Sequence, residues 1–280
     1  MKTGILVVDK PGGLTSHDVV SAVRRALGIR KVGHLGTLDP MATGVLPIVV
    51  GKATRLARYL PTSPKEYVGD IGLGWETTTG DREGEPLEPR SLDVTREEVE
   101  EAMRALEGDL LQTPPAFSAK KVGGVASYAL ARAGRPQTLE PAAVRVESFE
   151  LTRFAADAVG FRVVCSTGTY VRSLAVDLGR RLGTGAHLTS LRRLRAGAFR
   201  IEDAVRLGDA AEARLLPPQA PLAGMASLVV DADGEEQIRH GRPVPAETEA
   251  SPLCIFNKNG HLIAMAKAEK GWAHPQVVLI

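Results

Sequence analysis

The residues best suited to chemistry lie in a short segment between positions 33 and 44. Gly33 and Gly36 make this segment too rich in glycine for the interior of a helix or strand, so we expect a shaped loop. Pro40 follows Asp39 directly and biases it toward an extended backbone, which holds the carboxylate in one direction. A carboxylate fixed on such a loop could act as a base or a nucleophile. An ordinary turn would carry the same residues.

The segments on either side of this loop are expected to support it. Residues 4–9 are apolar and predict a short strand, which is followed by a turn at 10–13 and by a helix capped by Ser16. The β-branched run 45–50 predicts a buried strand directly after the loop. Lys10 therefore stands beside a chain reversal. It lies either near a cleft or on the surface of a hairpin.

Two further segments supply an aromatic and an apolar candidate. Residues 65–73 alternate in hydrophobicity, which predicts a strand with Tyr67 facing inward, where its hydroxyl needs a partner. Residues 188–199 predict a pair of strands with Leu191 in the wall of a cleft.

A cation is expected at the start of a later helix. Thr169 is predicted to cap this helix, which places Tyr170 and Arg172 in its first turn. A positive charge there opposes the helix dipole and suggests a compensating anion, for which Asp39 is the candidate. An arginine on the surface is the alternative.

Composition places the chain among soluble globular proteins. Its 280 residues are 44% hydrophobic, and this length suggests a main domain with a smaller one. No signal peptide is evident and no apolar run could span a bilayer, so we expect a cytoplasmic protein without membrane contact. Cys165 and Cys254 lie far apart without clustered histidines, which argues against a disulfide or a zinc site.

The net charge is only +2, but the charges are unevenly distributed. Acidic residues crowd the region 76–107. The basic clusters lie elsewhere, at Arg24, Arg25, Arg30, Lys31, Lys120, Lys121, Arg180, Arg181, Arg192, Arg193 and Arg195. Such segregation allows one face to carry a positive field and favours a nucleic-acid partner. Each pair taken alone also fits a solvated helix or strand face.

Residues 114–136 combine prolines with the basic pair Lys120 and Lys121 and with the pair Gly123 and Gly124. A basic, glycine-hinged excursion between core elements predicts a mobile binding segment.

The sequence around Asp39 closely resembles the catalytic loop of the TruB-type tRNA pseudouridine-55 synthases. Further blocks similar to that family occur in its order at residues 9–16, 65–67, 114–121, 166–172 and 187–193. The resemblance implies an α+β fold. A catalytic domain over residues 1–222 would contain a mixed, mainly antiparallel sheet with flanking helices and a thumb insertion at about 114–140. After a linker-like stretch at 217–221, residues 225–280 resemble a small, β-barrel-like PUA module that binds RNA.

The resemblance also implies roles for single residues. Asp39 would be the essential catalytic residue, paired with Arg172, and Tyr67 would stack on the target base. Lys120 and Lys121 would lie in the thumb that closes on the T-arm of tRNA. The full set of expected substrate-binding residues is Lys10, His34, Lys120, Lys121, Tyr170 and Leu191.

The expected reaction isomerises uridine 55 in the T-loop of tRNA to pseudouridine. It breaks the N1–C1′ bond, turns the uracil and rejoins it through C5, which requires no cofactor or metal, and the sequence has no P-loop, GxGxxG or zinc motif. Flipping the uridine out of the loop costs a few kcal/mol, of which stacking on Tyr67 can return about 1 to 3 kcal/mol. His34 either wedges into the vacated stack or braces the loop.

Two other functions fit parts of the sequence. An RNA-binding or tRNA-folding protein would flip and refold a T-loop without using Asp39. A subunit directed by a guide RNA is the second alternative, but relatives of that kind lack a thumb. We therefore expect a stand-alone enzyme that acts as a monomer and uses no guide RNA.

Overall fold

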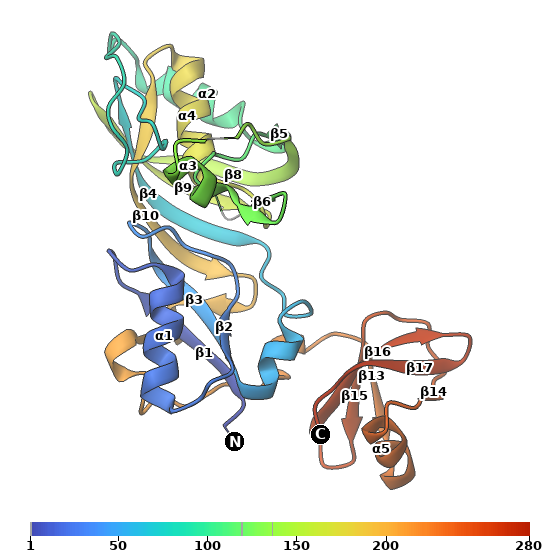
Figure 1. Cartoon of the computed structure of the whole chain (residues 1–280). Helices are drawn as coiled ribbons and strands as arrows, with labels where there is room; N and C mark the ends of the chain where they lie inside the picture. The colour runs from blue at the N-terminus through green and yellow to red at the C-terminus, as the bar shows by residue number, and fades with distance from the viewer. Residues whose placement is uncertain (1, 119, 136) are drawn as a thin grey trace.

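The computed structural model describes residues 2–118, 120–135 and 137–280. Within these ranges, the larger part of the chain builds a 10-stranded sheet, and the C-terminal part builds a separate 5-stranded sheet (Figure 1). None of the helices in this described part is long and apolar enough to cross a membrane.

Strands of the large sheet follow the order β12, β1, β3, β10, β4, β9, β8 and β5, with β2 paired to β3 and β11 paired to β10. Their bounds are β1 (Gly4–Lys10), β2 (Val32–His34), β3 (Thr43–Val50), β4 (Lys65–Leu73), β5 (Gly108–Gln112), β8 (Ala142–Ala155), β9 (Ala158–Cys165), β10 (Ala186–Ala196), β11 (Phe199–Arg200) and β12 (Val205–Arg206). Two of the pairings, β1 with β12 and β3 with β10, are parallel, and the others are antiparallel. The predicted α+β class with a mixed, mainly antiparallel sheet is confirmed.

The two halves of this sheet meet over a very short register. β10 pairs with β4 along most of its length, but it joins β3 only at Arg192 with Thr43 and at Arg193 with Gly44. Gly44 has a φ of 98°, and a Cβ there would overlap the backbone of Arg193. Only glycine permits this approach. The loop that carries Asp39 enters β3 at this junction.

Helices cover one face of the large sheet, because their apolar residues share one core with its strands (Figure 1). α1 (Ser16–Leu27) packs over the β1 and β3 half, whereas α2 (Arg96–Arg104) and α4 (Val171–Leu182) pack over the β4 to β8 half. Short 3-10 helices occupy Gly51–Leu56, Ile201–Asp203, Leu207–Asp209 and Ala220–Leu222.

The predicted caps of α1 and α4 are each wrong by one residue. Thr15 caps α1 in a reciprocal arrangement with Asp18, and this leaves the hydroxyl of Ser16 free for another partner. Tyr170, not Thr169, precedes the first turn of α4, and it has no side-chain cap. Arg172 nevertheless lies in that first turn, as predicted.

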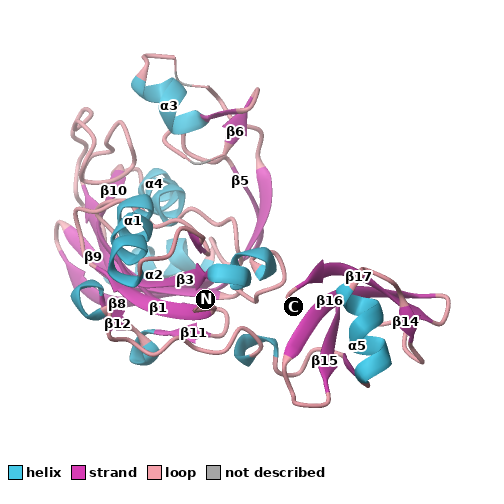
Figure 2. Ribbon diagram, turned by 60° about the horizontal axis from the view of Figure 1, so that its bottom comes forward, coloured by secondary structure: helices cyan, strands magenta, loops and turns pink. Residues whose placement is uncertain are grey.

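The thumb region runs between β5 and β8. It holds a hairpin of β6 (Lys121–Val122) and β7 (Val125–Ala126), followed by α3 (Ser127–Arg132). In Figure 2 the hairpin and α3 stand away from the large sheet. The side chain of Lys121 lies outside the described residues.

The C-terminal sheet has the order β13, β15, β16, β17 and β14. The bounds are β13 (Ser227–Val230), β14 (Val244–Pro245), β15 (Leu253–Asn257), β16 (Leu262–Glu269) and β17 (Trp272–Val278), with α5 (Ala232–Arg239) packed beside them (Figure 2). The assignment of residues 225–280 to a PUA module stays a prediction.

Candidate active site

Asp39 lies in the loop between β2 and β3, and the residue before it is held by the start of α1. Ser16 Oγ accepts a hydrogen bond from the Leu38 N–H at 2.8 Å and donates one to the Leu38 carbonyl at 3.1 Å. Ser16 is buried, so water does not compete for these bonds. This contact fixes the backbone that carries Asp39, and no local pattern predicts it beyond the start of a helix.

The residue after Asp39 accepts hydrogen bonds from the last residue of β1 and from the turn that follows it. Gly13 donates its N–H to the Pro40 carbonyl at 2.8 Å, and Lys10 Nζ donates to the same carbonyl at 3.2 Å and to the Pro11 carbonyl at 2.9 Å. Lys10 is fully buried, which excludes the alternative of a surface lysine. Burial lowers the pKa of Lys10 to about 8, although the charge of Asp39 acts in the opposite direction.

Arg172 binds the carboxylate of Asp39 through two hydrogen-bond donors. Nε lies 2.9 Å from Oδ2 and Nη2 lies 3.3 Å from Oδ1, the fork geometry of a strong guanidinium–carboxylate pair. Nη1 donates to the Thr79 carbonyl at 3.1 Å, and Nη2 donates to the Phe117 carbonyl at 2.8 Å. Arg172 is buried, whereas the Asp39 side chain is 35% exposed. The pair therefore presents an oriented carboxylate to the outside.

A second carboxylate, which sequence reasoning missed, contacts the same arginine. Asp81 Oδ2 lies 3.5 Å from Arg172 Nε, and the Asp81 side chain is only 5% exposed. Its Oδ1 accepts hydrogen bonds from Thr79 Oγ1 at 2.6 Å and from the Glu83 N–H at 3.0 Å. Asp81 is thus a buried counter-ion with fixed partners, whereas Asp39 remains the accessible member of the group.

Tyr67 points into the interior, as the alternation of its strand predicts. The side chain is buried, and desolvation raises the pKa of its hydroxyl. In the register of β4 and β10, Tyr67 stands opposite Arg193, whose Cζ lies 6.0 Å from the centre of the ring. The loop carrying Asp39 and the Tyr67 ring are therefore linked through one buried arginine.

His34 and Tyr170 lie on different elements, at the end of β2 and directly before α4. His34 ends β2 and is half-buried; its Nδ1 is buried without a partner among the described residues, and burial lowers its pKa. Tyr170 is also half-buried, and its backbone is anchored by the side chain of Gln112, which accepts from the Tyr170 N–H at 2.7 Å and donates to its carbonyl at 3.1 Å. Lys120 is exposed in the thumb region, with Nζ 3.1 Å from the Glu140 carbonyl.

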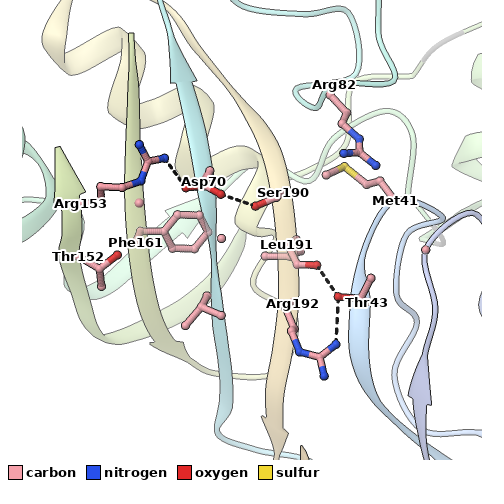
Figure 3. A pocket seen from close by; sticks show the side chains of 14 residues that line it. Met41, Thr43, Asp70, Arg82, Thr152, Arg153, Phe161, Ser190, Leu191 and Arg192 are labelled. Atoms are coloured by element: carbon pink, nitrogen blue, oxygen red, sulfur yellow. Dashed lines mark hydrogen bonds and ion pairs between the residues drawn. The ribbon is translucent and has the colours of Figure 1, made fainter. Parts of the chain in front are cut away.

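A cavity of about 710 Å³ lies beside the Asp39 loop (Figure 3). Met41 and Thr43 border it from the loop and β3, and Leu191 borders it from β10. Asp39, Tyr67 and Arg172 are not among its lining residues, so the role of Leu191 in a catalytic cleft stays a prediction. Figure 3 also shows Arg82 and Arg192 at the edge of this cavity. Arg192 is already paired with Asp9 at 2.7 Å, so Arg82 is the cation better suited to a polyanionic ligand. Within the described part of the chain, no three histidine, cysteine or acidic side chains gather as a metal site would require.

Solved structures with the same fold define the class of protein. The crystal structure of a Cbf5-Nop10-Gar1 complex matches with a TM-score of 0.76 and 27% identity, over 99% of this chain and 85% of that one. The structure of an H/ACA RNP bound to a substrate RNA containing 2′-deoxyuridine matches with a TM-score of 0.74 and 25% identity, over 99% and 85% of the two chains. The architecture is that of a pseudouridine synthase.

Sequence comparisons define the family more narrowly. The model of the TruB family pseudouridylate synthase N-terminal domain matches residues 24–171, and that of the tRNA pseudouridylate synthase B C-terminal domain matches residues 172–219. The tRNA pseudouridine synthase B of Thermobifida fusca is 45% identical over 99% of both chains, and that of Geobacillus kaustophilus is 40% identical over 92% of this chain and 97% of its own. The chain belongs to the TruB family of tRNA pseudouridine synthases, which are isomerases.

Proposed function

We propose that this enzyme converts uridine 55 in the T-loop of tRNA to pseudouridine without a guide RNA, with Asp39 as the reacting carboxylate. The observation that carries this proposal is the two-donor pairing of Asp39 with the buried Arg172. Because Arg172 is itself fixed by two backbone carbonyls, the carboxylate is preorganised before substrate arrives.

The difference in exposure supports the choice of Asp39 over Asp81. A flipped nucleotide can approach the 35% exposed side chain of Asp39, whereas Asp81 is enclosed by its hydrogen-bond donors. Asp39 then serves as nucleophile or base while the N1–C1′ bond breaks, the uracil turns and C5 bonds to C1′. C5 loses its proton and N1 gains one, so the product is an isomer of the substrate and the reaction has no net redox change.

Tyr67 is suited to hold the uracil while it is detached. Its raised pKa keeps the phenol neutral at neutral pH, which suits stacking on an uncharged base, and the negative charge of the site comes from Asp39. Leu191 offers an apolar wall on the neighbouring strand. Both contacts hold the base without reading its neighbours, which leaves selection of the T-arm to the outer surface.

Two observations support action without a guide RNA. Relatives named tRNA pseudouridine synthase B are 40 to 45% identical over nearly the whole chain, whereas the proteins solved in H/ACA assemblies are 25 to 27% identical. The thumb region also forms a hairpin and helix of its own, with Lys120 exposed for a phosphate contact.

The test is to incubate the purified enzyme with an unmodified tRNA transcript alone and to map pseudouridine by position. We expect product at position 55 only, and none in a transcript that carries cytidine there. Product that appears only after other RNA is added would overturn the claim of guide independence, and product at other positions would overturn the assignment of the target.

A further inference from the structure

Arg193 was predicted to belong to a basic surface, and this prediction is wrong. The residue is fully buried, because alternation along β10 turns it inward on the same side as Leu191. It occupies the point where β10 pairs with Gly44 on one side and with Tyr67 on the other. A contact between Arg193 and RNA is therefore excluded by burial.

The guanidinium of Arg193 donates to backbone carbonyls on both sides of Asp39. Nη2 lies 3.0 Å from the Gly36 carbonyl and Nη1 lies 3.4 Å from that of Thr37, both before Asp39. Nε lies 2.7 Å from the Val45 carbonyl, in the strand that follows the loop. One side chain therefore closes the two ends of the loop onto each other.

This arrangement is unusual in its charge balance. Among the residues that the structure describes, Arg193 forms no ion pair, and its buried charge is compensated by carbonyl dipoles and by the ring of Tyr67. A buried cation without a carboxylate partner is unfavourable for folding, and an apolar side chain of similar volume would avoid that penalty. Burial is the main cause of the lowered pKa values of Lys10, His34 and Lys65, and the nearby positive charge of Arg193 lowers them further.

We propose that Arg193 is a positioning residue that holds the Asp39 loop in its reactive shape through the carbonyls of Gly36, Thr37 and Val45. The proposal rests on the proposed role of Asp39 and extends it. Ser16 and Lys10 fix the residues directly beside Asp39, whereas Arg193 fixes the ends of the loop and ties them to the strand that carries Tyr67.

Two substitutions separate the fork of hydrogen bonds from the charge. Arg193→Lys keeps the charge but cannot span three carbonyls, and Arg193→Met removes the charge and keeps much of the volume. Arg206→Met is the matched control, because Arg206 lies on the edge strand β12 with 86% of its side chain exposed. Each variant is compared with the wild type for single-turnover pseudouridine formation, tRNA Kd and amide hydrogen exchange.

We expect the single-turnover rate of Arg193→Lys to fall about 10²-fold, as a misplacement of about 1 Å of a reacting group would cause. The tRNA Kd should stay within about threefold of the wild type, because Arg193 is not exposed to RNA. Exchange of the Leu38 and Ala42 amides, which are bonded to Ser16 and to the Asp39 carbonyl, should become faster, while amides of β9 keep their rates. The control should behave as wild type.

A single-turnover rate of Arg193→Lys within about twofold of the wild type would overturn the inference, as would a slower rate with unchanged exchange at Leu38 and Ala42. If Arg193→Met fails to fold, the rate and the amide exchange of Arg193→Lys alone test the inference. An inactive Asp39→Asn variant beside a fully active Arg193→Lys variant would defeat this inference alone. An active Asp39→Asn variant would defeat the proposed function instead.

Discussion

Arg172 stands between two carboxylates that differ in exposure. Its guanidinium donates two hydrogen bonds to Asp39 and one each to the carbonyls of Thr79 and Phe117. It also forms an ion pair with Asp81. A lysine would keep one positive charge but would lose the planar geometry that orients Asp39. The arginine therefore contributes direction as well as charge.

Arg172→Lys should lower turnover by about 10² or more, because the reacting carboxylate loses its fixed orientation. The tRNA Kd should change by less than about tenfold, since Arg172 is buried. Steady-state rates and a binding isotherm on one preparation check this, with Arg96→Lys on α2 as an exposed control. Turnover close to that of the control would remove Arg172 from the active site.

The two buried lysines Lys10 and Lys65 should make the free energy of unfolding depend on pH. Burial lowers the pKa values of Lys10 and Lys65 from 10.5 to about 8. Below pH 8 both amines are charged in the folded and the unfolded chain; between about 8 and 10.5 the unfolded chain binds more protons. The free energy of unfolding should therefore rise with pH in this window, by about 1.4 kcal/mol per pH unit for each lysine.

Lys10→Met should remove about half of that rise, which urea unfolding at a series of pH values from 7.5 to about 10 can measure. The same slope in the variant and in the wild type would mean that Lys10 keeps its proton throughout. Its burial would then be compensated by the charge of Asp39 more fully than its lowered pKa indicates.

At the residue scale, local sequence was informative only where a chemical rule applied. The pairing of Arg172 with Asp39 is predicted from the sequence because a cation in the first turn of a helix suggests a compensating anion. Asp81 gave no such signal; it lies in a polar loop, and its burial depends on pairing with Leu188 far along the chain. Arg193 did carry a signal, because the inward position of Leu191 implies the same for the residue two places on.

The start of α1 has two separable tasks, one for each of its hydroxyl residues. Thr15 caps the helix, and Ser16 holds Leu38 beside Asp39. Thr15→Ala should lower the free energy of unfolding by about 1 kcal/mol and leave turnover unchanged. Ser16→Ala should lower it by about 1 to 3 kcal/mol, because the Leu38 N–H loses its partner, and turnover should also fall.

Urea unfolding and single-turnover rates on the two variants check this assignment. Equal turnover in both would show that the hydrogen bonds of Ser16 to Leu38 do not position Asp39. Because each variant removes one hydroxyl from the same turn of chain, the comparison separates positioning from helix stability.

At the element scale, periodicity predicted β4, α1 and α4 well, because the apolar residues of each gather on one buried face. The continuous apolar run 45–50 predicted β3, which is buried on both faces. The helix starts were displaced by one residue for tertiary reasons. The hydroxyl of Ser16 bonds to Leu38 instead of its own helix, and the backbone of Tyr170 bonds to the side chain of Gln112. Contacts between distant segments of this kind leave no local pattern.

The C-terminal sheet is joined to the rest of the molecule through an apolar cluster. Met265, Val277 and Leu279 share this cluster with Ile5 and Leu56 of the larger part. Arg55 also donates a hydrogen bond to the carbonyl of Val278. The proline-rich composition of 217–221 predicts a linker, and Leu216, the residue directly before it, pairs with Ile5 through two backbone hydrogen bonds, at 2.8 and 2.9 Å. The stretch is therefore held at both ends, at Leu216 by these bonds and at the buried Leu222 by the apolar cluster.

The two parts should therefore unfold together. Met265→Ala should lower the free energy of unfolding by about 2 to 5 kcal/mol, and its effect should reach both parts. Trp75 lies in the larger part and Trp272 in β17, so the variants Trp272→Phe and Trp75→Phe each leave one fluorescent reporter. Coincident transitions from both reporters are expected, with or without Met265→Ala. Separate midpoints would show that the cluster does not couple the parts.

The most direct test of the whole account is Asp39→Asn. The substitution is nearly isosteric and removes only the ionised carboxylate, so base flipping, stacking on Tyr67 and the surface that binds RNA should persist. A tRNA binding isotherm is measured beside a pseudouridine assay on the same folded preparation. We expect a Kd within about tenfold of the wild type and no detectable pseudouridine. Synthase activity near that of the wild type would contradict the catalytic assignment of Asp39, and loss of binding together with activity would show that the loop shapes the RNA site instead of performing the chemistry.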